Sequence, residues 1–320
     1  MVTLLRINKQ LYHMHNLRII FMGTPEFAVP SLEILVESGY QVVAVITAPD
    51  RPKGRGQKLA TSPVKDCAVR CNLPVLQPTN LKDPAFIEEL KSYKANLQVV
   101  VAFRMLPEVV WNMPGIGTFN LHASLLPHYR GAAPIHWAIV NGEQETGVTT
   151  FFLKHQIDTG KIIFQEKESI GPADTVGELY ERLMQKGAHL VLKTVQAIEK
   201  DDYPQIEQEE SPGLKSAPKI FREDCQIDWN KPVAKVYDLI RGLSPHPAAW
   251  TEISGLNLKL YHVKPIYAED HPELSPGDFY TDGKSFLQFK TLDGMIEVLE
   301  LQLQGKKRMK IDEFLRGNKL

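Results

Sequence analysis

The chain has 320 residues, a length that favours two domains over one. Its 37 lysines and arginines nearly balance its 38 aspartates and glutamates, so the formal net charge is −1. No global field therefore draws the protein to nucleic acid or to a membrane, and any binding of a polyanion must come from local basic patches.

The three cysteines, Cys67, Cys71 and Cys225, form no disulfide framework, so we expect free thiols in a reducing, cytoplasmic compartment. Cys67 and Cys71 stand four residues apart on a predicted helix, but no second Cys or His motif completes a metal site, and we expect no metal. No apolar run approaches the roughly 20 residues of a membrane span, so we expect no membrane partner. Residues 1–16 lack the apolar core of a signal peptide, and we expect a disordered extension there, with Met14 as a second candidate start.

Strands and helices alternate through the first half of the chain. The apolar run 17–23 is typical of a buried parallel strand, and the helix after it has a kink or a late start at Pro30. Further strands are predicted over 42–46, 74–76, 97–103 and 118–123, with helices over 64–71, 83–93, 106–113 and 132–140. This order predicts an α/β fold with an open, mostly parallel, Rossmann-like sheet, on which ligands bind beyond the carboxyl ends of the strands. Only Gly23 of a G-x-G-x-x-G fingerprint follows the first strand, which argues against a nicotinamide oxidoreductase.

In the second half of the chain, the predicted strands and helices before and after a polar segment follow different patterns. A strand pair over 147–153 and 161–166 is followed by a long helix over about 175–200 and then by a segment rich in proline and polar residues. Beyond it we expect a helix over 233–242 and short strands over 256–263, 279–280, 286–289 and 296–301, separated by Asp-Gly turns. This pattern predicts a small, OB-like β-barrel. The expected organisation is an extension over 1–16, a catalytic domain over 17–203, a linker over 204–220 and a barrel domain over 221–320.

The stretch Phe119–Pro127 carries the strongest chemical signal. Side chains two apart on a strand point the same way, so Asn120 and His122 share one face at the end of a predicted strand. An amide can donate to a developing oxyanion, and an imidazole can donate, accept or carry charge. The alternative is a polar pair that is satisfied inside the fold.

Asp158 adds a carboxylate after the next strand. A lone Asp-Thr-Gly is most often a turn, but beside His122 its charge would favour the protonated imidazole. Such a site stabilises an oxyanion and moves protons. The chain has no G-x-S-x-G motif and no cysteine near His122, which favours direct transfer over covalent catalysis.

Two basic clusters stand out locally against the balanced total charge. The connection 47–65 is long for an α/β loop and contains one acid, Asp50, against five basic residues: Arg51, Lys53, Arg55, Lys58 and Lys65. A second cluster, Lys306, Lys307 and Arg308, lies in the predicted barrel domain. A loop of this kind beside a catalytic cleft suits a phosphate-rich partner, and the alternative for both clusters is a hydrated surface.

From about residue 17 to its end the chain resembles the methionyl-tRNA formyltransferase family. The resemblance is carried by the segments 19–25 (IIFMGTP), 49–56 (PDRPKGRG), 120–127 (NLHASLLP), 129–135 (YRGAAPI) and 157–160 (IDTG). The turn Ser124–Pro127 is shared across folate-dependent formyltransferases, whereas the basic loop and the C-terminal barrel mark the tRNA-directed branch.

The resemblance implies an activity and a set of partners. It implies formyl transfer from 10-formyltetrahydrofolate to the α-amine of initiator methionyl-tRNA, by a monomer with Asn120, His122 and Asp158 as the catalytic residues. It also implies a folate site near the segment 101–106 and the loop before Asp158, largely formed by backbone groups, with contacts at Val101, Phe103, Leu106, Ser124, Leu125, Leu126 and Pro127. For tRNA the resemblance implies contacts at Arg51, Lys53, Arg55, Lys58, Lys306, Lys307 and Arg308.

Two departures from the family pattern concern the folate site. The segment 102–107 is about one residue shorter than usual and has Arg104 where the family has glycine, and Gln156 replaces a glycine before Asp158. Two other functions fit parts of the same pattern. One is a formyltransferase acting on a small amine, and the other is a non-catalytic tRNA-binding protein.

Overall fold

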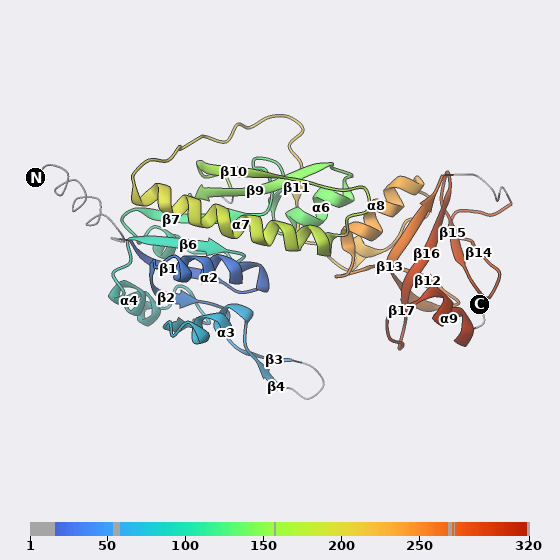
Figure 1. Ribbon diagram of the computed structural model, residues 1–320, viewed down its shortest axis with the longest axis horizontal. Helices are drawn as coiled ribbons and strands as arrows, with labels where there is room; N and C mark the ends of the chain where they lie inside the picture. The colour runs from blue at the N-terminus through green and yellow to red at the C-terminus, as the bar shows by residue number, and fades with distance from the viewer. Residues whose placement is uncertain (1–16, 54–57, 157, 268–270, 272, 319–320) are drawn as a thin grey trace, which may run out of the picture. The chain divides into compact units, whose positions relative to one another are not determined.

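The computed structural model describes residues 17–53, 58–156, 158–267, 271 and 273–318, and two compact units make up the chain (Figure 1). Unit 1 contains the described residues up to His128 with Gly147–Lys167 and Glu181–Leu214, and unit 2 contains the remainder. The extension expected over residues 1–16 and the side chain of Arg55 lie outside the described residues. None of the helices described here is long and apolar enough to cross a membrane.

Unit 1 is built on a seven-stranded sheet with the order β10-β9-β7-β6-β1-β2-β5. Strands β1 (Arg18–Gly23), β2 (Gln41–Ile46), β5 (Val75–Leu76), β6 (Leu97–Val101) and β7 (Gly117–His122) are parallel to one another. Strand β9 (Glu145–Phe152) pairs antiparallel with β7, and β10 (Ile162–Ser169) lies beyond it. The predicted mostly parallel sheet is confirmed, and its parallel strands are buried runs because helices cover both faces.

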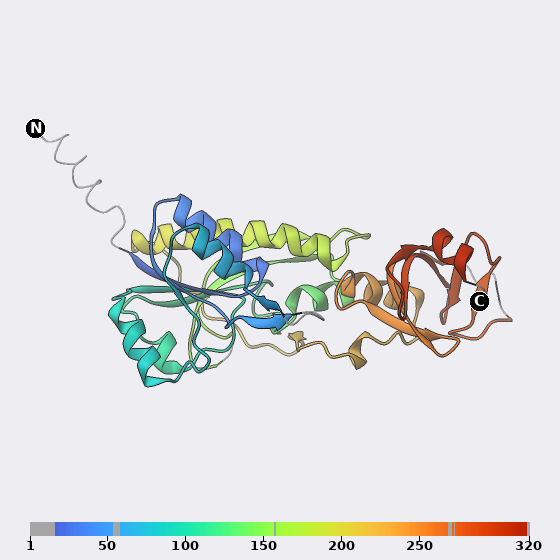
Figure 2. The ribbon, with the colours of Figure 1, turned by 90° about the horizontal axis from the view of Figure 1, so that it is seen from below.

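Helices pack on both faces of this sheet. A short 3-10 helix (Glu26–Ala28) leads into α2 (Val29–Glu37), whose proline in the first turn confirms a late helix start. Helices α3 (Pro63–Arg70), α4 (Pro84–Ser92), α5 (Glu108–Trp111) and α7 (Val176–Glu199) complete the set. Figure 2 shows α4 on the opposite face from α2 and α7. A Cβ added at Gly187 of α7 would lie 2.7 Å from Leu121, so α7 covers the face of β7 that carries Leu121.

The basic connection between β2 and α3 is not entirely irregular. Strands β3 (Arg51–Lys53) and β4 (Lys58–Ala60) form a two-stranded antiparallel hairpin, separate from the main sheet. Of Lys53 and Lys58 the structure describes the backbone. The expectation that this connection stays off the sheet is confirmed.

Unit 2 contains a curled antiparallel sheet with the order β12-β13-β16-β15-β14, to which β17 adds along β16 (Figure 1). The strands are β12 (Ala249–Ile253), β13 (Leu256–Ile266), β14 (Phe279–Thr281), β15 (Leu287–Lys290), β16 (Met295–Leu303) and β17 (Met309–Lys310). Helices α8 (Val233–Leu243) and α9 (Ile311–Gly317) supply buried residues to its core. Within the described residues the edge strands β12 and β14 do not pair with each other, so the sheet is a half-barrel.

The rest of unit 2 precedes this sheet. Helix α6 (Pro134–Val140) packs on α8, and the short strands β8 (Arg130–Gly131) and β11 (Ser216–Ala217) pair in parallel. A Cβ on Gly131 would lie 2.3 Å from the Ala217 carbonyl oxygen, so only glycine allows this approach.

Candidate active site

Asn120 and His122 lie at the carboxyl end of β7, in the middle of the main sheet. They alternate with Phe119 and Leu121, as the predicted strand requires, and their neighbours in β9 are Phe151 and Thr149. His122 is 6% exposed, whereas Asn120 is half-buried, and its side-chain amide makes no hydrogen bond to any residue that the structure describes. The amide is therefore available to a ligand beside a buried imidazole.

Asp158 approaches His122 from the loop between β9 and β10. The distance from its Oδ2 to His122 Nδ1 is 3.9 Å, and the exposed fractions of the two side chains are 13% and 7%. The φ of Asp158 is +55°, a left-handed conformation that aspartate tolerates better than most residues. Two separate segments of the chain thus bring three polar side chains to the same end of the strands of the sheet.

The segment after α7 supports the loop that carries Asp158. Gln208 Nε2 donates to the carbonyl oxygens of Asp158 (2.8 Å) and Gly160 (2.9 Å), and Ile206 forms a β-bridge with Ile162. A Cβ on Gly160 would lie 1.5 Å from the Phe152 carbonyl oxygen, so the loop also needs glycine there. The sequence did not single out Gln208, because it lies in a polar stretch without a pattern.

Side chains of β9 and β10 fix the turn that follows His122. Thr149 Oγ1 donates to the Ser124 carbonyl (2.6 Å) and accepts from the Leu126 amide (3.2 Å). Gln165 Nε2 donates to the Leu126 carbonyl (2.8 Å) and to Thr149 Oγ1 (2.9 Å). Ser124 Oγ donates to the carbonyl of His128. Thr149 and Gln165 are therefore supporting residues that the sequence did not predict.

The residues expected to contact folate fall into two groups. Val101, Ser124 and Leu126 are buried, so only their backbone groups are open to a ligand, whereas Leu125 and Pro127 are half-buried. Phe103 and Leu106 are also half-buried, and they pack against the core formed by β1, β2, α4 and α5.

The backbone of residues 103–106 makes no hydrogen bond within the part of the chain that the structure describes. Such a segment offers donors and acceptors to the edge of a flat heterocycle.

Arg104 turns away from this free backbone. Its guanidinium donates to the carbonyl oxygens of Pro78 and of Thr79 (3.0 Å). It also lies 5.7 Å from the centroid of the Phe103 ring. Burial, and then the charge of Arg51, lower the pKa of Arg104. The residue that replaces the family glycine thus anchors the segment to the loop after β5.

The basic residues expected to bind tRNA divide between the units. Arg51 is exposed at the start of β3 in unit 1, whereas Lys306 and Lys307 are exposed between β16 and β17 in unit 2. Arg308 is engaged by its own unit, since it donates to Glu300 (2.5 Å) and lies 4.2 Å from the centroid of the Tyr261 ring.

Within the described residues, neither a metal centre nor a thiol nucleophile lies with Asn120, His122 and Asp158. No group of three His, Cys, Asp or Glu residues there could hold a metal ion. The three cysteines are free, and burial raises the pKa of Cys67 to about 12, which keeps it a thiol.

The sequence matches known formyl transferases over most of its length. The family described as formyl transferase matches residues 17–195, and the family described as formyl transferase, C-terminal domain, matches residues 219–319. A methionyl-tRNA formyltransferase of Bacteroides fragilis is 57% identical over 308 residues, covering 94% of this chain and 95% of that protein. The protein of the same name from Flavobacterium johnsoniae is 51% identical, with 95% and 97% covered.

Solved structures share the fold at lower identity. The N-formyltransferase of Helicobacter canadensis, in complex with folinic acid and dTDP-3-aminofucose, has a TM-score of 0.68 at 21% identity and covers 92% of this chain and 100% of that chain. HypX of Aquifex aeolicus, in complex with tetrahydrofolic acid, has a TM-score of 0.63 at 18% identity and covers 94% of this chain and 47% of that chain. With its family matches and close relatives, the chain belongs to the methionyl-tRNA formyltransferase family.

Proposed function

We propose that this protein transfers the formyl group of 10-formyltetrahydrofolate to the α-amine of methionine on initiator tRNA. Relatives that are 50–57% identical over nearly the whole chain carry the name of this activity. The observation on which the proposal depends is the buried His122 with Asp158 at 3.9 Å, on the same strand end as the unbonded amide of Asn120.

The reaction begins when the neutral amine attacks the formyl carbon and forms a tetrahedral oxyanion. The Asn120 amide and the protonated ring of His122 donate hydrogen bonds to that oxygen. Asp158 orients the ring and supports its positive charge. No covalent intermediate with the protein is needed.

Collapse of the intermediate completes the transfer. The bond between the formyl carbon and N10 breaks, the new amide keeps the formyl group, and N10 takes up one proton. The attacking nitrogen loses one proton, which Asp158 accepts directly or through a water molecule and returns towards N10. Atoms and charge balance without a metal or a redox partner.

The two substrates would approach from different sides of this trio. The pterin fits the unpaired backbone of residues 103–106, with the turn Ser124–Pro127 alongside. The acceptor stem fits the basic β3–β4 hairpin, and the cluster of Lys306, Lys307 and Arg308 adds sequence-independent phosphate contacts. We also propose that the protein acts as a cytoplasmic monomer, consistent with its three free thiols.

A formyl-transfer assay with three acceptors tests this function. Initiator methionyl-tRNA should be formylated much faster than elongator methionyl-tRNA and than a nucleotide-linked amino sugar. His122→Ala should lower kcat by about 10²–10³-fold or more with initiator tRNA while the protein stays folded.

Faster transfer to the amino sugar would instead support a small-amine formyltransferase. Binding of tRNA without any folate-dependent transfer would support a non-catalytic role. Near-normal turnover by His122→Ala would show that His122 does not stabilise the oxyanion.

A further inference from the structure

The β3–β4 hairpin needs an anchor outside its own strands. It has three cross-strand pairs, from Arg51 opposite Ala60 to Lys53 opposite Lys58. Leu59 is 73% exposed, so the hairpin buries little apolar surface, and an isolated two-stranded hairpin is only marginally stable in water. Its direction must be set where it joins the rest of unit 1.

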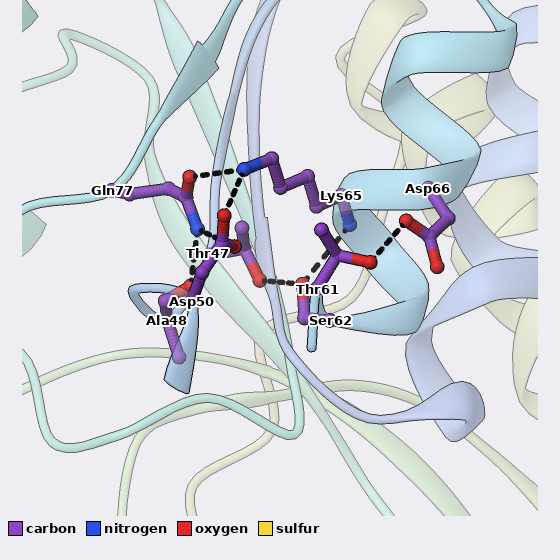
Figure 3. A network of polar contacts seen from close by, with 8 residues as sticks. All are labelled: Thr47, Ala48, Asp50, Thr61, Ser62, Lys65, Asp66 and Gln77. Atoms are coloured by element: carbon purple, nitrogen blue, oxygen red, sulfur yellow. Dashed lines mark hydrogen bonds and ion pairs between the residues drawn. The ribbon is translucent and has the colours of Figure 1, made fainter. Parts of the chain in front are cut away.

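Two side-chain contacts join the chain that enters the hairpin to the chain that leaves it (Figure 3). Thr47 Oγ1 and Ser62 Oγ are 2.7 Å apart, and Ser62 also caps α3 by accepting from the Lys65 amide (3.0 Å). Further along, Lys65 Nζ lies 2.5 Å from Asp50 Oδ2. We call the residues Thr47, Asp50, Ser62 and Lys65 the neck of the hairpin.

Gln77 joins this neck to the main sheet. It directly follows β5, which pairs with β2. Its Nε2 donates to the Ala48 carbonyl (2.7 Å) and to Asp50 Oδ1 (2.8 Å), and its Oε1 accepts from Lys65 Nζ (2.8 Å). The opposite orientation of the amide would place its NH₂ against an ammonium and its oxygen against two oxygens, so the partners allow only one orientation. Figure 3 shows the Gln77 amide beside Asp50 and Lys65.

These contacts also determine the charge that the hairpin presents. Asp50 is the only acid between Thr47 and Lys65, and hydrogen bonds from Lys65 and Gln77 hold its pKa below the usual value, so it stays ionised. Because its charge is neutralised by Lys65, it does not oppose a polyanion at the neighbouring Arg51, whose side chain is exposed.

We propose that Gln77 is a positioning residue for the acceptor substrate. Through its hydrogen bonds to Asp50 and Lys65, Gln77 holds the β3–β4 hairpin in the orientation that lets Arg51 contact the phosphates of the tRNA. This inference rests on the proposed function, since it assumes that tRNA is the acceptor. It assigns a substrate-specific role to a side chain that itself touches neither substrate.

Gln77→Leu tests the role, because leucine occupies a similar volume without any hydrogen bond. We expect the KM for initiator methionyl-tRNA to rise at least about fivefold, the factor that corresponds to about 1 kcal/mol. The KM for the folate and the kcat at saturating tRNA should stay within about twofold. A plot of log(kcat/KM) against log salt should become shallower, as it should for Arg51→Gln, because fewer phosphates are contacted.

Thr61→Val is the matched control. It removes a hydrogen bond to Asp66 (2.6 Å) at the start of α3, beside the neck but outside the contacts of Gln77. The two KM values, kcat and the salt dependence should all stay unchanged. If Gln77→Leu folds poorly, Gln77→Met gives the same test, because methionine also lacks the amide and leaves the charges of Asp50 and Lys65 in place.

The outcomes separate this inference from the proposed function. If the unaltered protein does not formylate methionyl-tRNA, the proposed function is wrong. If it does, but Gln77→Leu keeps the tRNA KM and the salt dependence, the positioning role is wrong. A fall in kcat together with a rise in both KM values and a lower Tm would show that Gln77 has a purely structural role.

Discussion

Asn120 allows the oxyanion role to be tested with little disturbance of the fold. Its amide has no hydrogen bond to a described residue and is half-buried, so Asn120→Ala removes no structural contact of the amide. We expect kcat to fall by about 10²–10³-fold, because one donor to the oxyanion is lost. Steady-state kinetics with saturating folate and tRNA measure this effect.

Thermal unfolding of the same variant is the control, and Tm should change by no more than a degree or two. A normal kcat would show that the amide does not act on the transition state. A large fall in Tm would show instead that Asn120 is the satisfied core residue of the alternative interpretation.

The position of Asn120 beside His122 could be predicted from a local pattern, whereas Asp158 was expected there from the family resemblance. Alternation along a strand places Asn120 and His122 together, and the strand order brings the loop of Asp158 to them. Gln208 could not be predicted in the same way. Its contact with the Asp158 loop spans 50 residues and depends on how the chain returns after α7.

At the scale of elements, Thr149 of β9 holds the turn that follows β7. Thr149→Val keeps the shape of the side chain, but leaves the Ser124 carbonyl, the Leu126 amide and one Gln165 contact without this partner. Thr149 is fully buried, so the loss should cost about 1–3 kcal/mol in the free energy of unfolding. Urea denaturation followed by circular dichroism measures it.

The KM for folate should rise in the same variant, because the turn lies beside the expected folate site. Gln288→Leu is a suitable control, since its 3.3 Å contact with Glu297 is in unit 2. Unchanged stability and unchanged folate KM in Thr149→Val would show that the turn holds its shape without this hydroxyl.

Most elements were predicted, including the short strands β5, β14 and β15, and a few were missed. The main strands and the helix α7 follow hydrophobic patterns that burial alone explains. Strand β12 was missed. Helix α9 was also missed, since its seven residues depend on tertiary packing of Phe314 and Leu315.

At the scale of the whole molecule, the balanced charge means that local clusters must supply any attraction to tRNA. We predict that replacing both Lys306 and Lys307 by alanine raises the KM for tRNA several-fold and makes the dependence on salt shallower. Both are exposed between β16 and β17, so stability should be unchanged. Kinetics at several salt concentrations provide the measurement.

Lys284, exposed on a turn between β14 and β15, provides a control in the same unit that removes one positive charge, for comparison with Lys306→Ala or Lys307→Ala alone. Lys284→Ala should leave the tRNA KM near normal. An equal effect of the two replacements would indicate non-specific loss of positive charge. No effect of the double replacement would remove this cluster from the proposed tRNA surface.

The sequence predicted the strands of the second sheet, but not how far that sheet closes. Alternating apolar residues and Asp-Gly turns predict antiparallel strands, and these are present in unit 2. Whether such strands close into a full barrel depends on pairing between the two edges, which no local pattern encodes. Over the described residues the structure has a curled half-barrel, in which β12 and β14 do not pair with each other.

The contacts of Ile206 and Gln208 have a consequence for dissecting this protein. A shortened chain ending at Tyr203 would still contain Asn120, His122 and Asp158 and every strand of the seven-stranded sheet. It would lack the amide that bridges two carbonyl groups of the acid-bearing loop. We therefore expect that a truncated catalytic fragment must extend beyond the last residue of its sheet and helices, to include Gln208. A chimaera joined before Ile206 would contain Asn120, His122 and Asp158 but lack the contacts that hold the loop of Asp158.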